Sequence, residues 1–264
     1  MVRGHFIIYS DQKIALELNL NTGELSLPSV IVDKSINHAI KKALSIEVVD
    51  FKTLKEDKDS LFMLIGDWEG KLKPNSPLKR IIWLNIKDAL DKIEESHKSI
   101  LTFFRENYRE VILNDKTVGI ASIDECNKYN LATRRVEAFI LNEDKQLMLK
   151  KEKNDKLSSL FAYPMLCESG EEAIYRLLSE EFGTLTEIKK YKQFKDKLNS
   201  VVIFTGSFDQ SLTFFSESIK KAIFRPLNIL KESITLPNPH EEILSEGLKN
   251  VLKAYFSQEQ GLNA

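Results

Sequence analysis

The sequence predicts an α/β protein built from two α/β/α sandwich domains, each with a mixed sheet between helices. Three observations lead to this fold class: a globular composition, apolar periodicities that switch between strand and helix, and an internal repeat. We expect the first domain in residues 1–110 and the second in residues 111–264. A chain of 264 residues is long enough to form two cores of ordinary size.

The repeat begins with a pair of matching hairpins. Residues 6–18 (FIIYSDQKIALEL) and 139–151 (FILNEDKQLMLKK) each contain an apolar run, a polar turn and a second run with alternating apolar residues. This pattern is typical of a β-hairpin. Residues 38–48 and 172–182 then carry apolar residues at helical spacing, which predicts a helix in each half.

The remaining blocks match in the same order. The offset between the halves stays at about 133 to 141 residues, which favours a true repeat over the features that any two α/β domains share. Residues 110–122 predict one further hairpin before the second domain. The matching pairs are 61–71 with 201–211 (buried strands expected to end at Gly66 and Gly206), 81–90 with 222–230, and the closing helices 96–107 with 239–256.

Composition excludes several classes of protein. The 38 Lys and Arg residues nearly balance the 39 Asp and Glu residues, so no basic excess indicates nucleic-acid binding. The two cysteines are too few for a disulfide framework, and the four histidines lack the spacing of zinc ligands. No apolar stretch approaches the roughly 18 residues of a membrane span, and no signal-peptide pattern is present. We therefore expect a cytoplasmic protein with no membrane partner.

The stretch ESGEEAIYRLLSEEFG, residues 168–183, carries the clearest chemical pattern. Ser169 followed by Glu172 predicts a capping box that begins a helix. On that helix Glu172, Arg176 and Glu180 follow one another at i, i+4 spacing, so the arginine can bridge carboxylates and orient them.

This order of elements resembles the Nudix superfamily, whose signature reads G-x5-E-x7-R-E-U-x-E-E-x-G-U with U apolar. Ala162, Leu177 and Thr184 depart from the signature, replacing the first glycine, the glutamate after arginine and the last apolar residue. The matching residues are Glu168, Arg176, Leu178, Glu180, Glu181 and Gly183.

The resemblance covers most of residues 110–256 and is closest to the isopentenyl-diphosphate isomerase branch. The catalytic cysteine and metal-binding histidine of that enzyme would fall at Phe161 and Tyr163. Neither residue can perform their chemistry, so we exclude isomerase activity.

The resemblance implies catalytic roles for Glu168, Arg176 and Glu181, with Glu180 and Glu181 as ligands of Mg²⁺, for which Mn²⁺ can substitute. Residues 177, 180 and 181 converge on one patch of a helix, where three carboxylates would form an oxygen-rich Mg²⁺ site. Leu177 breaks this set, so we expect weak metal binding. The alternative is an ordinary amphipathic helix with Leu177 in the core and Arg176 in a solvated ion-pair network.

A second group of candidates is cationic. Lys150, Lys151 and Arg134, supported by Arg135 and Lys153, are predicted to contact the phosphates of a nucleoside diphosphate. The alternative is a solvated loop without a ligand.

The first domain keeps little of the signature. In register, the arginine position becomes a lysine, and one carboxylate remains, which cannot assemble a metal cluster. We expect this domain to be non-catalytic and to serve in packing, dimerisation or ligand capture. The residues at the signature positions are Lys34, Lys42, Ala43, Ile46, Glu47 and Val49.

The function that we predict is binding of a nucleotide or another diphosphate compound, with catalysis weak or lost, in a sensor, scaffold or partner-binding protein. The first alternative is an active Mg²⁺-dependent pyrophosphohydrolase. The second is a purely structural protein-interaction module. A protein partner or a homodimer fits each of these functions.

Overall fold

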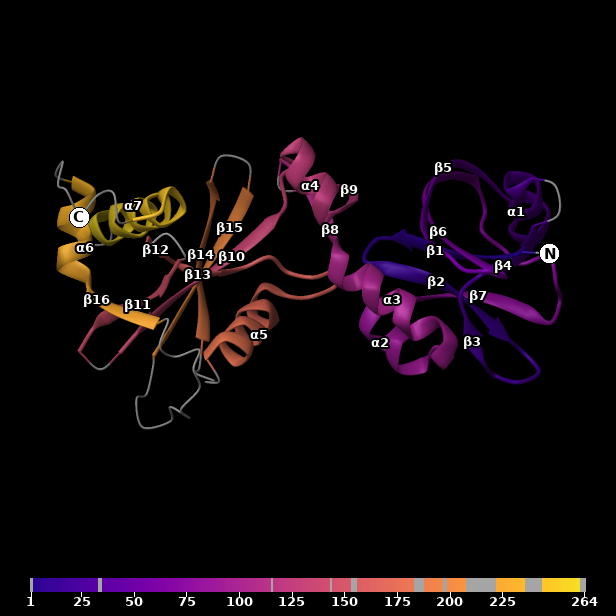
Figure 1. Cartoon of the computed structure of the whole chain (residues 1–264), viewed down its shortest axis with the longest axis horizontal. Coiled ribbons are helices and arrows are strands. Elements are labelled where there is room, and N and C mark those ends of the chain that lie inside the picture. Colours follow the sequence, from indigo (N-terminus) through magenta and orange to yellow (C-terminus); the bar gives the residue numbers. More distant parts are fainter. Residues whose placement is uncertain are drawn as a thin grey trace. The chain divides into compact units, whose positions relative to one another are not determined.

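The structure is a computed structural model that describes residues 2–32, 35–114, 116–142, 144–152, 156–182, 188–196, 199–207, 222–235 and 244–261. The chain forms two compact units (Figure 1). Unit 1 comprises Met1–Glu110, Gly119–Ile123 and Met165–Cys167, and unit 2 comprises Val111–Val118, Asp124–Pro164 and Glu168–Ala264. Both units contain a mixed sheet with helices on its two faces, which confirms the predicted α/β class.

Unit 1 is built on a sheet in the order β3-β2-β1-β6-β5, with β4 paired to β1 and β7 paired to β2. β1 runs parallel to β6. The strands are β1 (Val2–Ser10), β2 (Lys13–Asn19), β3 (Leu25–Ser26), β4 (Ser29–Val32), β5 (Ile46–Glu56), β6 (Ser60–Gly70) and β7 (Lys79–Asn85), and the helices are α1 (Ile36–Leu44), α2 (Ile86–Lys92) and α3 (Glu95–Asn107).

A two-residue turn joins β1 to β2, as the hairpin prediction required. Ser10 pairs with Lys13, and the intervening Asp11 and Gln12 have φ angles of 49° and 63°. Positive φ at both central residues is the geometry of a type I′ turn, whose twist matches that of the flanking strands.

Beyond the turn, β1 and β2 diverge. His5 of β1 pairs with Ser29 of β4, whereas Glu17 of β2 pairs with Ser26 of β3 and Ile81 of β7. β3 and β4 therefore lie between the two hairpin strands at this end of the sheet.

The two faces of this sheet bury different helices, because successive residues of β1 point to opposite sides. Phe6 packs with Ile40 of α1 on one face. Ile7 packs with Ile86 of α2 and Phe104 of α3 on the other face. All five side chains are fully buried, and Figure 1 shows α1 on one side of the sheet with α2 and α3 on the other.

Unit 2 has the same strand order, β12-β11-β10-β15-β14, with β13 paired to β10 and β16 paired to β11. β10 runs parallel to β15, as β1 does to β6. The strands are β10 (Arg134–Leu141), β11 (Gln146–Lys151), β12 (Leu157–Ser158), β13 (Leu160–Ala162), β14 (Ile188–Asp196), β15 (Asn199–Ser207) and β16 (Ala222–Pro226), and the helices are α5 (Gly170–Phe182), α6 (Leu227–Thr235) and α7 (Glu246–Gly261).

The sheet of unit 2 also separates two cores. Ile140 packs with Ile174 of α5 on one face. Phe139 packs with Leu230 of α6 and Leu252 of α7 on the other face. Figure 1 shows α5 and the α6–α7 pair on opposite sides of this sheet.

The predicted hairpin in residues 110–122 is present as a two-stranded sheet of β8 (Tyr108–Leu113) and β9 (Lys116–Ser122). α4 (Ile123–Tyr129) follows it directly.

Two predicted boundaries are wrong. β6 continues past Gly66 to Gly70, because its antiparallel pairing with β5 extends to Ile46. The last helix begins at Glu246 rather than near residue 239, since the Ser245 hydroxyl accepts a hydrogen bond from the Leu248 amide (3.2 Å) and caps the helix there. Residues 239–243 lie outside the described residues.

Within the described residues, no helix has both the length and the apolar character needed to cross a membrane.

Two histidines are buried together in unit 1. His5 of β1 is 8% exposed and His97 of α3 is 3% exposed, and their facing ring nitrogens lie 3.0 Å apart. Phe62 stacks on the His5 ring. Burial, followed by the neighbouring His97, lowers the pKa of His5 from 6.5 to about 4, and burial also lowers the pKa of His97.

We predict that unit 1 loses stability on mild acidification. Between pH 6.5 and about 4 the unfolded chain binds a proton at His5 that the folded chain does not, so the free energy of unfolding falls as the pH falls through this window. We expect a loss of about 3 kcal/mol. Urea titrations at several pH values, followed by the fluorescence of Trp68 and Trp83, measure it, because both tryptophans of the chain lie in unit 1.

His5→Gln should remove most of this dependence, whereas His38→Gln, at an exposed histidine of α1, should leave it unchanged. Equal pH dependence in the wild type and His5→Gln would show that the buried pair does not control it.

Candidate functional site

A capping box fixes the start of α5. The Ser169 amide donates to the Glu172 carboxylate (2.8 Å), and the Glu172 amide donates to the Ser169 hydroxyl (3.2 Å). Both predicted hydrogen bonds are present, and they satisfy donors that the first turn of a helix leaves unpaired. The box places Glu168 immediately before the helix.

Arg176 binds Glu168 with two hydrogen bonds. Its Nε lies 2.8 Å from one carboxylate oxygen and its terminal nitrogen lies 3.0 Å from the other. The Glu168 side chain is 4% exposed and that of Arg176 is 26% exposed. Arg176 also donates to the Tyr163 carbonyl (3.4 Å), so it ties the segment before α5 to the helix. Two-point pairing of this kind fixes orientation as well as charge.

The carboxylates at the end of α5 are arranged differently. Glu180 lies 3.7 Å from Arg176 and its side chain is 63% exposed, so this second contact is weak. Glu181 belongs to the last turn of α5, and its side chain lies outside the described residues. Leu177 packs against the core on the α5 face, with Ile174 and Leu178.

The described residues show no cluster of carboxylates of the kind expected for Mg²⁺. Within that part of the chain, no three His, Cys, Asp or Glu side chains are grouped so that they could hold a metal ion. Both oxygens of Glu168 contact Arg176, and Leu177 offers no oxygen. The metal-binding role of Glu180 and Glu181 stays a prediction.

Strand geometry separates the predicted phosphate-binding cations. Lys150 alternates with Leu149 and points to the α5 face, as does Arg134, whereas Lys151 points to the α7 face. At Lys150, β11 pairs with β12 and β16, while β10 pairs with β13 and β15 near Glu137. Lys150 and Arg134 therefore share one face of the sheet but lie on different strands, whereas Lys151 lies on the other face. Their contact with phosphate stays a prediction, and Lys153 lies outside the described residues.

A buried ion pair in β10 was missed by the sequence reasoning. Glu137 is fully buried, and Arg135 binds it from the same face of the strand. The Arg135 guanidinium also lies 4.4 Å from the Phe161 ring centre and against Gly247 of α7. The signal was a pair of opposite charges two residues apart in an apolar strand, which predicts that they share a face.

No protein-family profile and no curated protein matches the sequence. Among solved structures, a Deinococcus radiodurans protein is 16% identical, with a TM-score of 0.45, and the match covers 56% of this chain and 97% of that protein. A mutT/nudix family protein from Listeria innocua is 15% identical, with a TM-score of 0.36, covering 50% and 97%. A MutT NUDIX hydrolase from Burkholderia pseudomallei is 17% identical, with a TM-score of 0.31, covering 38% and 95%.

The similarity to these neighbours is one of structure alone. At this level of identity and structural overlap, they say nothing about the family, activity or ligand of the chain.

We predict that the Arg176–Glu168 contact stabilises α5 far more than the Arg176–Glu180 contact does. Arg176→Ala removes the arginine from a buried carboxylate, which should lower the opening free energy of α5 by about 2–3 kcal/mol. Glu180→Ala should cost less than about 0.5 kcal/mol, because its side chain is exposed. Hydrogen–deuterium exchange of peptides from residues 170–182 measures both changes.

The double variant Glu168→Ala with Arg176→Ala serves as the control, since it removes the buried charge together with its partner. Its loss should be smaller than the sum of the two single losses. Additive losses would show that the two side chains do not stabilise the helix as a pair.

Proposed function

We propose that unit 2 binds a nucleotide or another diphosphate compound, with hydrolysis weak or lost, and that the protein acts as a sensor, scaffold or partner-binding protein. The observation that carries this proposal is the state of the helix α5 box. Its arginine and first glutamate are engaged with each other, and Leu177 packs into the core where the signature has a third carboxylate.

The chemistry of phosphoanhydride cleavage explains why these features matter. Hydrolysis requires neutralised phosphate charge and an activated water, which a metal ion held by carboxylates supplies when it is bound. Glu168 accepts hydrogen bonds from Arg176 with both oxygens, so it is poorly placed to take a proton from water. Binding is less demanding, because Arg176 is 26% exposed and a guanidinium is geometrically suited to phosphate oxygens.

Unit 1 has the same strand order as unit 2, and we propose that the two are copies of one fold. Lys42 and Ala43 occupy the positions on α1 that align with Arg176 and Leu177 on α5. Unit 1 thus has a lysine in place of the bidentate arginine and keeps a single signature carboxylate, Glu47, which supports a non-catalytic role.

The alternative is an active Mg²⁺-dependent pyrophosphohydrolase that uses Glu168, Glu180 and Glu181. The intact capping box and the Arg176–Glu168 contact favour it, because they orient the helix as an active site requires. A purely structural module, with no small-molecule ligand, is the remaining candidate.

Phosphate release from a broad panel of nucleoside diphosphate derivatives, with Mg²⁺ or Mn²⁺, tests the proposal. We expect turnover by the wild type to be no higher than that of Glu181→Gln, while at least one compound binds in calorimetry. Turnover that Glu181→Gln abolishes would overturn the proposal in favour of the hydrolase. Neither turnover nor binding on any compound would leave the structural module.

Restoring the third carboxylate should restore metal binding. Leu177→Glu places an oxygen donor one turn from Glu181, so we predict an increase of at least about ten-fold in Mn²⁺ affinity over the wild type. Leu177→Gln is the matched control, since it has the same shape without the charge. Calorimetric Mn²⁺ titration measures the difference, and equal affinities in the two variants would contradict the prediction.

A further inference from the structure

Unit 1 contains a cavity of about 410 Å³ on the α1 face of its sheet, where β1 and β2 diverge. Cavities that bind small molecules span roughly 300–1,000 Å³, so this one has the size for a small metabolite. Its polar lining comes from four parts of the unit that are distant in sequence. These side chains are Glu17, Ser29, His38, Lys42, Asn75 and Lys79.

An ion pair between a buried carboxylate and a partly exposed lysine lies on one side of the cavity. The Glu17 side chain is 5% exposed, and one of its oxygens accepts a hydrogen bond from Lys79 at 2.7 Å. Within the described residues, no donor reaches its other oxygen. A carboxylate removed from water is costly unless its hydrogen-bonding capacity is used, so the second oxygen is an acceptor for a ligand donor.

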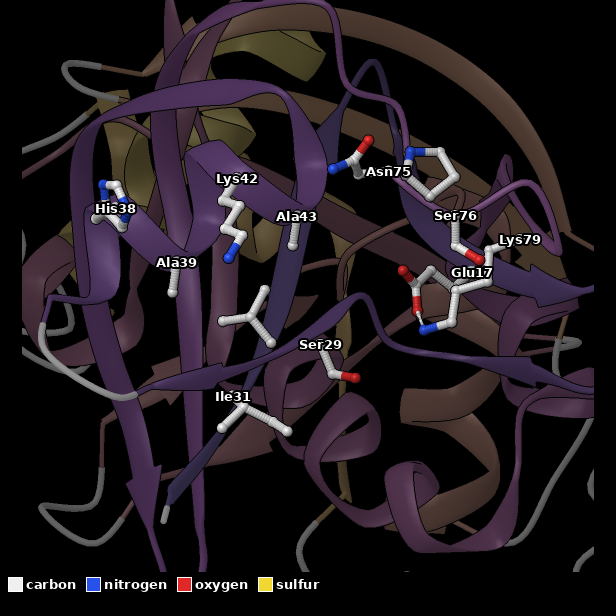
Figure 2. A pocket seen from close by; sticks show the side chains of 12 residues that line it. Glu17, Ser29, Ile31, His38, Ala39, Lys42, Ala43, Asn75, Ser76 and Lys79 are labelled. Carbon is white, nitrogen blue, oxygen red and sulfur yellow. Dashed lines mark hydrogen bonds and ion pairs between the residues drawn. The ribbon is translucent and has the colours of Figure 1, made fainter.

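Lys42 supplies a positive charge on the other side. Figure 2 shows the Lys42 amine pointing away from α1 into the cavity. The Glu17–Lys79 pair lies across the cavity from it. Lys42 forms no hydrogen bond or ion pair with any described residue. The neighbouring Lys41 is instead paired with Glu47 at 2.9 Å, outside the cavity.

The cavity is held in shape by backbone hydrogen bonds. The amides of Lys73 and Asn75 donate to the carbonyls of Leu44 and Ala43, at 3.0 Å and 2.8 Å. These bonds fix the segment that carries Pro74 against the end of α1. A preformed wall lowers the entropic cost of binding.

We propose that this cavity binds a phosphorylated polyol, that is, a sugar phosphate or a nucleoside monophosphate. Lysine binds phosphate as a compact charge with rotatable donors, whereas a planar carboxylate is better matched by arginine, so the group facing Lys42 is a phosphate. Glu17 is acceptor-only and repels an anion, so the opposite end of the ligand presents hydroxyl or amino donors to it. Val30, Ala39 and Pro74 supply the apolar wall between the two ends.

The site is independent of the α5 box of unit 2. It uses none of the same residues, and it assigns to unit 1 a ligand of its own.

Titration of the whole protein with ribose 5-phosphate and AMP tests this proposal, with inorganic phosphate and ribose as partial ligands. Fluorescence of Trp68 and Trp83 reports on unit 1. Trp83 pairs with Ala15, whose side chain is in the core on the α1 face, whereas the next residue, Leu16, is in the core on the other face. Trp83 therefore lies on the α1 face together with Glu17. We expect a Kd of about 1 mM or tighter for a phosphorylated polyol and weaker binding of either part alone. No binding of any phosphorylated polyol would overturn the proposal.

Two variants in the last turn of α1 distinguish an effect on ligand binding from an effect on the stability of the helix. Lys42→Gln should weaken binding at least about ten-fold and reduce its dependence on salt. Lys41→Gln, which removes a charge from the same last turn of α1, should leave binding unchanged. Equal effects of the two variants, or no effect of Lys42→Gln, would contradict the assignment of Lys42.

Glu17→Gln tests the other end of the site. It should weaken binding of ribose 5-phosphate while leaving inorganic phosphate binding unchanged or stronger, because a repelling charge has been removed. Weaker binding of both compounds would contradict the role given to Glu17. Glu181→Gln should not alter any of these affinities, so failure of the site in unit 2 and failure of this site are distinguishable.

Discussion

The central strand of each sheet is apolar on both faces, and this constraint determines the rest of the architecture. Phe6 and Ile7 in β1, and Phe139 and Ile140 in β10, are neighbours in sequence that enter different cores. Side chains alternate along a strand, so such a run cannot leave either face to solvent. Each sheet must therefore be covered by helices on both sides, and a three-layer unit results.

Because both faces are covered, a charged side chain between the layers is removed from water, which costs free energy unless the charge is paired. Glu137 is paired with Arg135 on the same strand face, and Glu168 with Arg176 from α5. In both cases a guanidinium contacts the carboxylate, which is the best geometric match for two-point pairing. Glu17 differs, because its partner is a lysine that engages one oxygen and the other faces a cavity.

Local features were predictable from the sequence, and non-local ones were not. The capping box at Ser169 and the turn at Asp11 and Gln12 depend on residues within four positions of one another, and both formed as expected. The pairing of β11 with β12 and β16 depends on strand register across the unit, so the sequence could not show that Lys150 and Arg134 lie on different parts of the sheet.

The cavity in unit 1 was beyond sequence reasoning for the same reason. From the sequence alone, Lys42 at the position aligned with Arg176 indicated only that the first domain departs from the signature. The fold brings residues from three strands and a distant loop around that lysine, and only this arrangement places its charge in a cavity.

Lys42 and Arg176 occupy aligned positions in the sequence, and the fold gives their charges different surroundings. Arg176 is committed to Glu168, so its charge is largely used in holding α5 in place. Among the described residues no carboxylate pairs with Lys42, and its charge faces a cavity. A cation that is neutralised within the fold attracts an anionic ligand less strongly than one that is not. The proposed phosphate ligand of unit 1 therefore depends on a cation that, within the described residues, is not neutralised by a carboxylate.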